Sequence, residues 1–162
     1  MEALSVNIRI AELDDIDNLV KARFDYFAAE KWDVSFEQHE VIEKNLREYY
    51  SKHLNNDFFV ALVEVDNEIA SIAFLAVSAK PANLSFPTGK TGTVLNVLTY
   101  PNYRKKGYAT MSMNLLIEIA KAQSLSYVEL SASESGKSLY QRLGFKEKEA
   151  SEHFIGMKLS LM

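Results

Sequence analysis

Two long apolar stretches lie next to each other in the chain, with only two residues between them. They read FFVALVEV, residues 58–65, and EIASIAFLAVS, residues 68–78, and both are rich in β-branched and aromatic side chains. Asp66 and Asn67, which separate them, tolerate the positive φ that a tight hairpin needs. The pair therefore predicts two adjacent antiparallel strands.

The segments before this hairpin predict a strand and two helices. Apolar and polar residues alternate over 6–11, which is typical of a short strand. Asp14 and Asp15 supply N-cap chemistry for a helix from about residue 15 to 30, whose apolar residues recur at helical spacing. Ser35 and Gln38 form a capping box for a second helix, which carries Ile42, Leu46 and Tyr49 as its buried stripe.

The segments after the hairpin predict further strands and helices in alternation. GTVLNVLT, residues 92–99, is a strand that ends before Pro101, and a helix starts near Gly107. The next segments are a strand over 127–133, a last helix that Ser135 caps and Gly144 ends, and a closing hairpin made of 145–149 and 153–160.

The whole pattern predicts an α/β fold of the order β-α-α-β-β-β-α-β-α-β-β. We expect a central mixed, mostly antiparallel sheet of about seven strands, flanked by four helices. A chain of 162 residues with 48% hydrophobic content is long enough for one sizeable core, so we expect a single domain over residues 1–162.

Composition argues against several classes of function. The absence of Cys excludes disulfides and thiolate sites, and the three His residues are far apart, so we expect no metal site. A net charge of −4 argues against a nucleic-acid partner. The N-terminus lacks the pattern of a signal peptide, and no apolar stretch reaches the roughly 18 residues of a membrane span. We expect a cytoplasmic protein without a membrane partner.

The segment YPNYRKKGYATMSMNLL, residues 100–116, places three cations at the start of an apolar helix. The first four N–H groups of a helix have no intrahelical partner, and the helix dipole places positive charge there, so this end favours an anion. Gly107 has no Cβ and lets a ligand approach the backbone, and Ala109 keeps the first turn open. Taken alone, the six residues from 104 to 109 fit a phosphate seat and a solvated turn equally well.

The motifs around this segment resemble the GNAT superfamily of N-acetyltransferases. The resemblance rests on an apolar strand, VLNVLT, followed by Pro101, by the run RKKGYA at 104–109 and a helix, by YVELSAS, and by LYQRLGF at 139–145. These motifs occupy about a third of the chain, and the remaining predicted elements follow the family's order.

The resemblance implies roles for particular residues. The strand that carries Val97, Leu98 and Thr99 would pair with the pantetheine arm of acetyl-CoA, and the N–H of Leu98 would stabilise the acyl oxygen as it gains negative charge. Tyr140 would protonate the departing thiolate. Ser133 stands where many relatives have an Asn, and would contact the cofactor arm through water. The backbone of the basic turn would hold the pyrophosphate, with Arg104, Lys105, Lys106, Gly107, Tyr108, Ala109 and Thr110 as its residues.

The implied reaction moves an acetyl group to a primary amine of a small molecule or peptide by direct attack, without a metal. No residue stands out as the general base, because Glu129 is doubtful and the other strand residues are weak bases. We expect ordered water in that role and Asn96 as a polar positioning group. The acceptor pocket would come from the first two helices, their linker and a later loop, namely Tyr26, Phe27, Trp32, Asp33, Phe36 and residues 81–91.

Two alternatives to this interpretation remain open. Glu30, Asp33, Glu37 and Glu40 either attract a cationic amine or, as we favour for any one of them, solvate the helix ends. The chain is either an enzyme or a module that binds CoA, or an acidic partner, without turnover. The apolar stretch over 153–162 suits the edge of a homodimer as well as the sheet.

Overall fold

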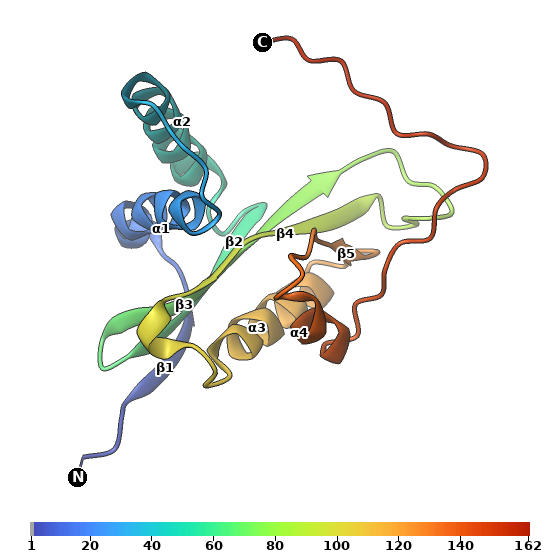
Figure 1. Ribbon diagram of the computed structural model, residues 1–162. Helices are drawn as coiled ribbons and strands as arrows, with labels where there is room; N and C mark the ends of the chain where they lie inside the picture. The colour runs from blue at the N-terminus through green and yellow to red at the C-terminus, as the bar shows by residue number, and fades with distance from the viewer. Residues whose placement is uncertain (1) are drawn as a thin grey trace. The chain divides into compact units, whose positions relative to one another are not determined.

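The computed structural model describes residues 2–162 and contains one five-stranded sheet in the order β1-β2-β3-β4-β5. The first four strands are antiparallel to their neighbours, and β5 is parallel to β4 (Figure 1). The strands span Val6–Ile10 (β1), Phe58–Val65 (β2), Glu68–Ala79 (β3), Lys90–Thr99 (β4) and Val128–Glu129 (β5).

The hairpin of β2 and β3 forms as the sequence predicts. Val65 pairs with Glu68, and the two residues between them, Asp66 and Asn67, have φ values of 50° and 68°. Short polar side chains tolerate this left-handed conformation, which lets the chain reverse within two residues. Strand β2 is almost wholly buried, residues 70–75 of β3 are buried, and the two strands lie inside the sheet.

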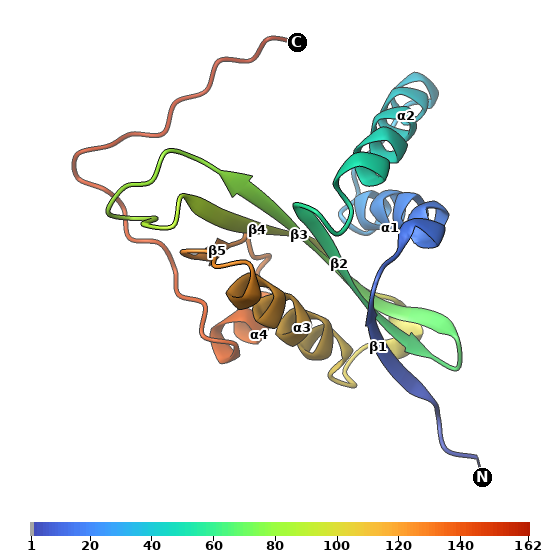
Figure 2. The same cartoon turned by 180° about the vertical axis from the view of Figure 1, so that it is seen from behind.

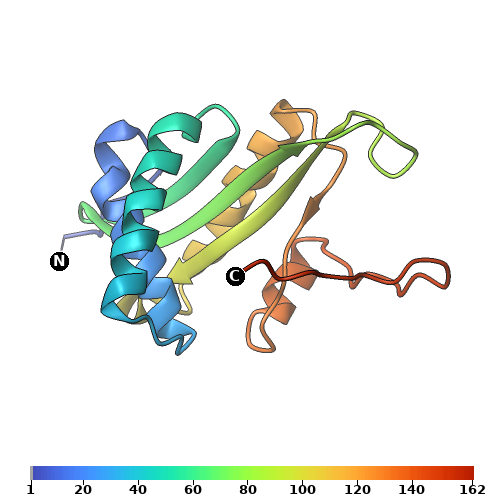
Figure 3. The same cartoon turned by 90° about the horizontal axis from the view of Figure 1, so that it is seen from above.

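Helices cover both faces of the sheet. Helices α1, Ile16–Ala29, and α2, Phe36–His53, lie on one face, and α3, Tyr108–Ala122, lies on the other (Figures 1 and 2). The view from above shows α1 and α2 side by side and α3 across the strands from them (Figure 3). The prediction of a mixed, mostly antiparallel sheet with four helices is confirmed, the fourth being α4, Lys137–Arg142.

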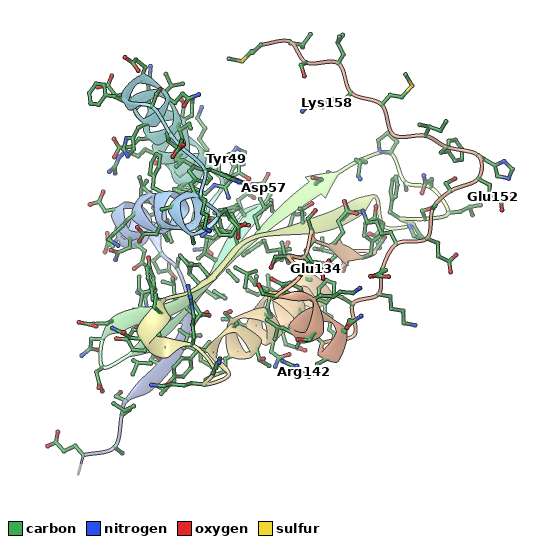
Figure 4. All side chains as sticks on the ribbon, viewed as in Figure 1. Tyr49, Asp57, Glu134, Arg142, Glu152 and Lys158 are labelled. Carbon is green, nitrogen blue, oxygen red and sulfur yellow. The ribbon has the colours of Figure 1, made fainter. Side chains whose placement is uncertain are left out.

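The core on the side of α1 and α2 is aromatic. Tyr50 of α2 is 1% exposed and stacks on Phe58 at 5.4 Å between ring centroids. The predicted stripe placed Tyr49 there, but Tyr49 is 37% exposed and stacks on His53, whose Nδ1 lies 2.7 Å from Asp57 Oδ1. Figure 4 shows Tyr49 and Asp57 near each other where α2 leads into β2. The buried stripe of α2 therefore includes Leu46 and Tyr50, and Tyr49 lies at its edge, where it still packs against Phe58 at 5.2 Å between ring centroids.

The start of α1 also differs from the prediction. Asp15 does not cap α1 with its side chain; its carboxylate instead accepts two hydrogen bonds from the Arg9 guanidinium, at 2.7 and 2.8 Å. Arg9 also donates to Glu64 of β2, and Asp15 accepts from the N–H of Glu12 in a short 3-10 turn, Leu13–Asp15. This network joins β1, β2 and the turn before α1.

The chain forms two compact units, Met1–Ser131 and Ala132–Met162, and the sheet with α1, α2 and α3 belongs to the first. The second unit contains α4, which ends at Arg142, and an extended segment, on which Figure 4 labels Glu152 and Lys158. Gly144 follows α4 with a φ of 98°, as predicted. The predicted cap is wrong, because Ser133 Oγ, rather than Ser135, accepts a hydrogen bond from the N–H of Gly136 at 3.2 Å.

The prediction of about seven strands is wrong, because the sheet has five. Residues 145–149 and 153–160 adopt no strand, and only Val128 and Glu129 of the predicted strand at 127–133 pair with a neighbour. An alternating apolar pattern becomes a strand only where a partner supplies hydrogen bonds and covers one face. Phe154 and Ile155 are instead 81% and 88% exposed.

Within the described residues, none of the helices combines the length and the apolar character that a membrane crossing requires.

Candidate functional site

Strand β4 contains a bulge at the position of Asn96. Ile72 of β3 pairs with Leu98 and Phe74 pairs with Leu95, so two residues of β4, Asn96 and Val97, face a single residue of β3. Asn96 has a φ of 55°, in the left-handed region that Asn tolerates better than most residues. Its side chain is only 2% exposed. The bulge therefore inserts one residue into a strand that is otherwise regularly paired.

This bulge reverses the direction in which the β4 backbone donates hydrogen bonds. The N–H of Gly92 donates to Tyr127 on the β5 side, whereas the N–H of Tyr100 donates to Ala70 of β3, each at 3.0 Å. In an uninterrupted strand, residues an even number apart donate to the same edge. The extra residue changes this, so Leu98, like Tyr100, directs its N–H toward β3, while Val97 and Thr99 direct theirs toward the opposite edge.

That opposite edge of β4 is paired over only part of its length. The ladder with β5 consists of Gly92 with Val128 and Thr93 with Glu129, and β5 ends at Glu129. Among residues 2–131, β4 therefore has no ladder partner on this side from 94 to 99. Beyond the bulge, this edge exposes the N–H and C=O groups that face away from β3.

A turn with two left-handed residues follows β4. A short 3-10 helix, Pro101–Tyr103, ends the strand, and Lys105 and Gly107 have φ values of 62° and 84°. Gly107 is the N-cap of α3, where no side chain caps the helix, and a Cβ built on Gly107 meets no heavy atom within 4 Å. Backbone with alternating left-handed residues turns successive N–H groups toward a common side.

The backbone N–H groups of this turn have no acceptor within the part of the chain that the structure describes. The first hydrogen bond of the helix joins the N–H of Met111 to the carbonyl oxygen of Gly107 at 3.1 Å. No protein oxygen accepts from the N–H groups of 105–110, as expected where a helix start lacks a cap. Six consecutive unpartnered donors at and just before the positive end of a helix dipole are suited to binding an anion.

The three cations of the turn add positive charge to these donors. Arg104, Lys105 and Lys106 are exposed, and none of them forms an ion pair with a described residue. Arg104 Nε donates to the carbonyl oxygen of Thr99 at 3.1 Å, so this side chain also ties the turn to the end of β4. The turn at residues 104–110 is therefore electropositive in a chain that is acidic overall.

Tyr108 differs from the other residues of the turn. Its side chain is 8% exposed and packs with Val63, Val65 and Ala70 on the α3 side of the sheet. The phenol anchors the first turn of α3 in the core, so only its backbone N–H is available to a ligand. Ala109 and Thr110 are half-buried.

The bulge contacts helix α1 through Asn96. The Nδ2 atom donates to the carbonyl oxygen of Ala22, and Oδ1 accepts from Nη1 of Arg23, both at 3.4 Å. The Arg23 guanidinium lies 4.9 Å from the ring centroid of Phe27. Burial lowers the pKa of Arg23, and the phenols of Tyr50 and Tyr26 oppose this effect. A polar cluster of α1, α2 and β4 residues thus lies beside the bulge.

The residues predicted for the acceptor pocket come together only in part. Phe27 is buried and stacks on Trp32 at 5.5 Å, and Tyr26 packs edge-on against Trp32 at 6.0 Å. Trp32 and Phe36 are 56% and 74% exposed, and Phe36 makes no ring contact with another described residue. Within the predicted loop, Phe86 lies under Lys80 Nζ at 4.8 Å.

Tyr140 and Ser133 belong to the second compact unit and are described within it. Tyr140 lies on α4 and packs edge-on against Phe145 at 6.0 Å. Ser133 Oγ lies 3.2 Å from Ser135 Oγ and, as noted above, accepts from the N–H of Gly136. The motif LYQRLGF therefore builds one local structure, in which the ring of Phe145 supports that of Tyr140.

The sequence did not predict two features of the candidate site in the first unit. The positive φ of Lys105 has no signal in its side chain, since a Lys in that conformation is uncommon. Arg23 looks like a surface residue of an amphipathic helix, and only the contact with Asn96 of a distant strand reveals its position.

No group of three or more His, Asp or Glu side chains suited to a metal occurs in the described residues.

Residues 17–145 match the acetyltransferase (GNAT) family. The chain belongs to this family. An N-alpha-acetyltransferase of Sulfurisphaera tokodaii is 30% identical over 154 residues, which cover 91% of this chain and 84% of the relative. The class of activity of this GNAT protein is therefore N-acetyl transfer, and its cosubstrate is acetyl-CoA.

Solved structures agree with this assignment. A predicted acetyltransferase from Clostridium acetobutylicum with acetyl-CoA has a TM-score of 0.81 and 27% identity, covering 95% of this chain and 96% of that one. A GCN5-related N-acetyltransferase from Ralstonia eutropha has a TM-score of 0.76 and 21% identity, covering 93% and 99% of the two chains, and shares the fold.

Proposed function

We propose that this GNAT protein moves an acetyl group from acetyl-CoA to a primary amine of a small molecule or peptide, by direct attack within a ternary complex. The observation that supports the proposal most strongly is the run of six unpartnered N–H groups at 105–110, beside three unpaired cations. These donors suit the pyrophosphate of CoA, with Gly107 allowing close approach. The open edge of β4 next to this seat suits the amide groups of the pantetheine arm.

The hydrogen-bond direction of β4 refines the proposed donor to the acyl oxygen. Leu98 directs its N–H to β3, so this N–H is already used in the sheet. Val97 is the first residue after the bulge residue Asn96, and its N–H faces the open edge. We therefore assign the stabilisation of the developing negative charge to the N–H of Val97 in place of that of Leu98.

The side chains have distinct proposed roles. Tyr140 donates a proton to the thiolate as the carbon–sulfur bond breaks, so that CoA leaves as the neutral thiol. Asn96 positions the bulge through Ala22 rather than removing a proton, because an amide is not a base. Ordered water takes the proton from the amine. Ser133 supports the start of α4 through the N–H of Gly136.

Initial rates at varied concentrations of both substrates test the direct mechanism. Direct attack requires both substrates on the enzyme together, so double-reciprocal lines should intersect, and no acetylated protein should accumulate without an amine. Parallel lines together with an acetyl-enzyme would contradict direct attack, because they are the signature of a covalent intermediate.

A further inference from the structure

Arg23 is a half-buried cation without a carboxylate partner. The described residues offer its guanidinium one hydrogen-bond acceptor, Asn96 Oδ1 at the long distance of 3.4 Å, and one ring, that of Phe27 at 4.9 Å. Its electrostatic interactions are with the phenols of Tyr50 and Tyr26. A guanidinium carries five N–H donors in a rigid fork, so most of the hydrogen-bond donors of Arg23 have no acceptor among the described residues.

Two other arginines of the first unit, Arg9 and Arg47, have carboxylate partners. Arg9 forms ion pairs with Asp15 and Glu64, and Arg47 forms ion pairs with Asp17 and Glu43. These two arginines are neutralised within the protein although they are more accessible to water. Removing a cation from water without an anion costs free energy. The partial burial of an unpaired Arg therefore does not stabilise the fold and indicates another role for this side chain.

A second buried polar group at the same place also lacks a partner. The hydroxyl of Tyr50 is fully buried and forms no hydrogen bond with a described residue, and Tyr50 as a whole is 1% exposed. Buried hydroxyl groups are nearly always hydrogen-bonded in folded proteins. Unused donors on both Arg23 and Tyr50, next to the β4 bulge, indicate that this cluster recognises an acceptor atom from outside the protein.

The position of the cluster relates it to the transfer reaction. Asn96, which Arg23 contacts, directly precedes Val97, whose N–H we assign to the acyl oxygen. We propose that Arg23 binds a carboxylate of the acceptor, and that the acceptor is a free amino acid, an amine and a carboxylate in one small molecule. This inference rests on the proposed function for the identity of the reacting amine. Because Arg23 contacts the residue next to Val97, its guanidinium lies near the proposed acyl site, which suits an amine and a carboxylate only a few bonds apart.

A carboxylate fits the cluster better than a more highly charged anion. The planar fork of an Arg matches the two oxygens of a carboxylate, and a single cation balances a single negative charge. The lysine of α1, Lys21, is already paired with Asp25 at 2.6 Å. The aromatic rings of Phe27 and Tyr26 would contact the apolar part of the amino acid.

Matched acceptors test the proposal in the full-length protein. Each L-amino acid is compared with its own primary amide, which keeps the α-amine and removes the negative charge, and CoA thiol release gives kcat and KM. We expect KM for the acid to be lower than that for the amide by about 10- to 100-fold, as for a charged hydrogen bond. Arg23→Met should remove this preference, Arg23→Lys should restore part of it, and Arg47→Met should leave it unchanged.

Binding separates this inference from the proposed function. Calorimetry of the CoA-bound protein with the acid and with the amide needs no turnover. If no amine supports thiol release but the acid binds in an Arg23-dependent way, the proposed function fails and the carboxylate site stands. Equal binding of acid and amide, an unchanged preference in Arg23→Met, or a preference for peptides whose carboxylate is remote would overturn the inference.

Discussion

The side-chain amide of Asn96 donates a hydrogen bond to the backbone carbonyl oxygen of Ala22 at 3.4 Å and so joins the bulge of β4 to helix α1. The bulge decides which β4 residues turn their N–H groups away from β3, and its position therefore decides which of them can reach a ligand at the open edge. One buried side chain thus links the helix that carries Arg23 to the strand that carries the proposed oxyanion donor.

The left-handed conformation of Asn96 predicts different costs for two truncations. Asn96→Gly and Asn96→Ala both remove the contact with Ala22, but only Gly adopts a φ of 55° without strain. We expect Asn96→Ala to be less stable than Asn96→Gly by about 1 kcal/mol or more in urea unfolding. Equal stability of the two variants would contradict the strained bulge.

The hydrogen-bond direction of β4 predicts the effects of removing single backbone N–H groups. Replacing the amide of residue 97 or 98 by an ester, through an α-hydroxy acid, removes the N–H and keeps the side chain. The ester at Val97 should lower kcat by about 100-fold, as for loss of an oxyanion donor, with little loss of stability. The ester at Leu98 should mainly lower the free energy of unfolding, by about 1 kcal/mol. The reverse pattern would return the role to Leu98.

Gly107 is predicted to be essential for binding CoA rather than for folding. A side chain there meets no heavy atom within 4 Å, so Gly107→Glu should fold, at a cost of about 1 kcal/mol for the positive φ, while placing a negative charge among the donors of 105–110. Calorimetry should detect no acetyl-CoA binding to this variant. Gly107→Asn tolerates the positive φ without charge and should retain weakened binding. An unchanged affinity of Gly107→Glu for acetyl-CoA would exclude this turn as the pyrophosphate-binding site.

Tyr140 is predicted to act in the chemical step. Tyr140→Phe keeps the ring that packs on Phe145 and removes the proton donor, so kcat should fall by about 100-fold with acetyl-CoA affinity near that of the wild type. Tyr127→Phe, at a tyrosine outside the proposed machinery, is the matched control and should keep full activity. An unaffected rate in Tyr140→Phe would remove Tyr140 as the acid.

The Arg9 network predicts a pH-dependent contribution to stability. Hydrogen bonds from Arg9 lower the pKa values of Asp15 and Glu64 below those of the unfolded chain. Their stabilisation is therefore fully present above the ordinary carboxylate pKa of about 4 and is lost as pH falls through the lowered values. Arg9→Met should cost about 1–2 kcal/mol at pH 7, at the low end because Arg9 is 34% exposed, and the cost should shrink below about pH 4.

The control for this network is Arg47→Met, which removes two exposed ion pairs. Urea unfolding of this variant should resemble that of the wild type at every pH, because exposed pairs contribute little. A cost in Arg9→Met that stays constant down to pH 2 would show that packing, rather than charge, accounts for the effect.

Local sequence patterns predicted the features that depend on neighbouring residues. The hairpin at Asp66 and Asn67, the capping box of Ser35 with Gln38, and Gly107 at the start of α3 all form as predicted. Each of these depends on a few consecutive residues and on backbone conformations that particular residue types favour. The family resemblance carried by the motifs around α3 is likewise confirmed.

Features that depend on distant contacts were not predictable in this way. A bulge adds one residue without changing the apolar pattern of β4, so the reversed role of Val97 and Leu98 appears only from the pairing with β3. The pattern at 153–160 is that of a strand, but the five-stranded sheet does not include it. The proposed role of Arg23 depends on its contact with Asn96, which lies 73 residues away in the sequence.

Acetyl transfer is tested most directly by measuring CoA thiol release and N-acetylated product together, with acetyl-CoA and a panel of amines that includes free amino acids. We predict that at least one amine is acetylated, with one thiol released for each acetyl group transferred, and that Gly107→Glu abolishes both signals. Tight binding of acetyl-CoA without acetylation of any amine in the panel would show instead that the protein binds the cosubstrate without transferring its acetyl group.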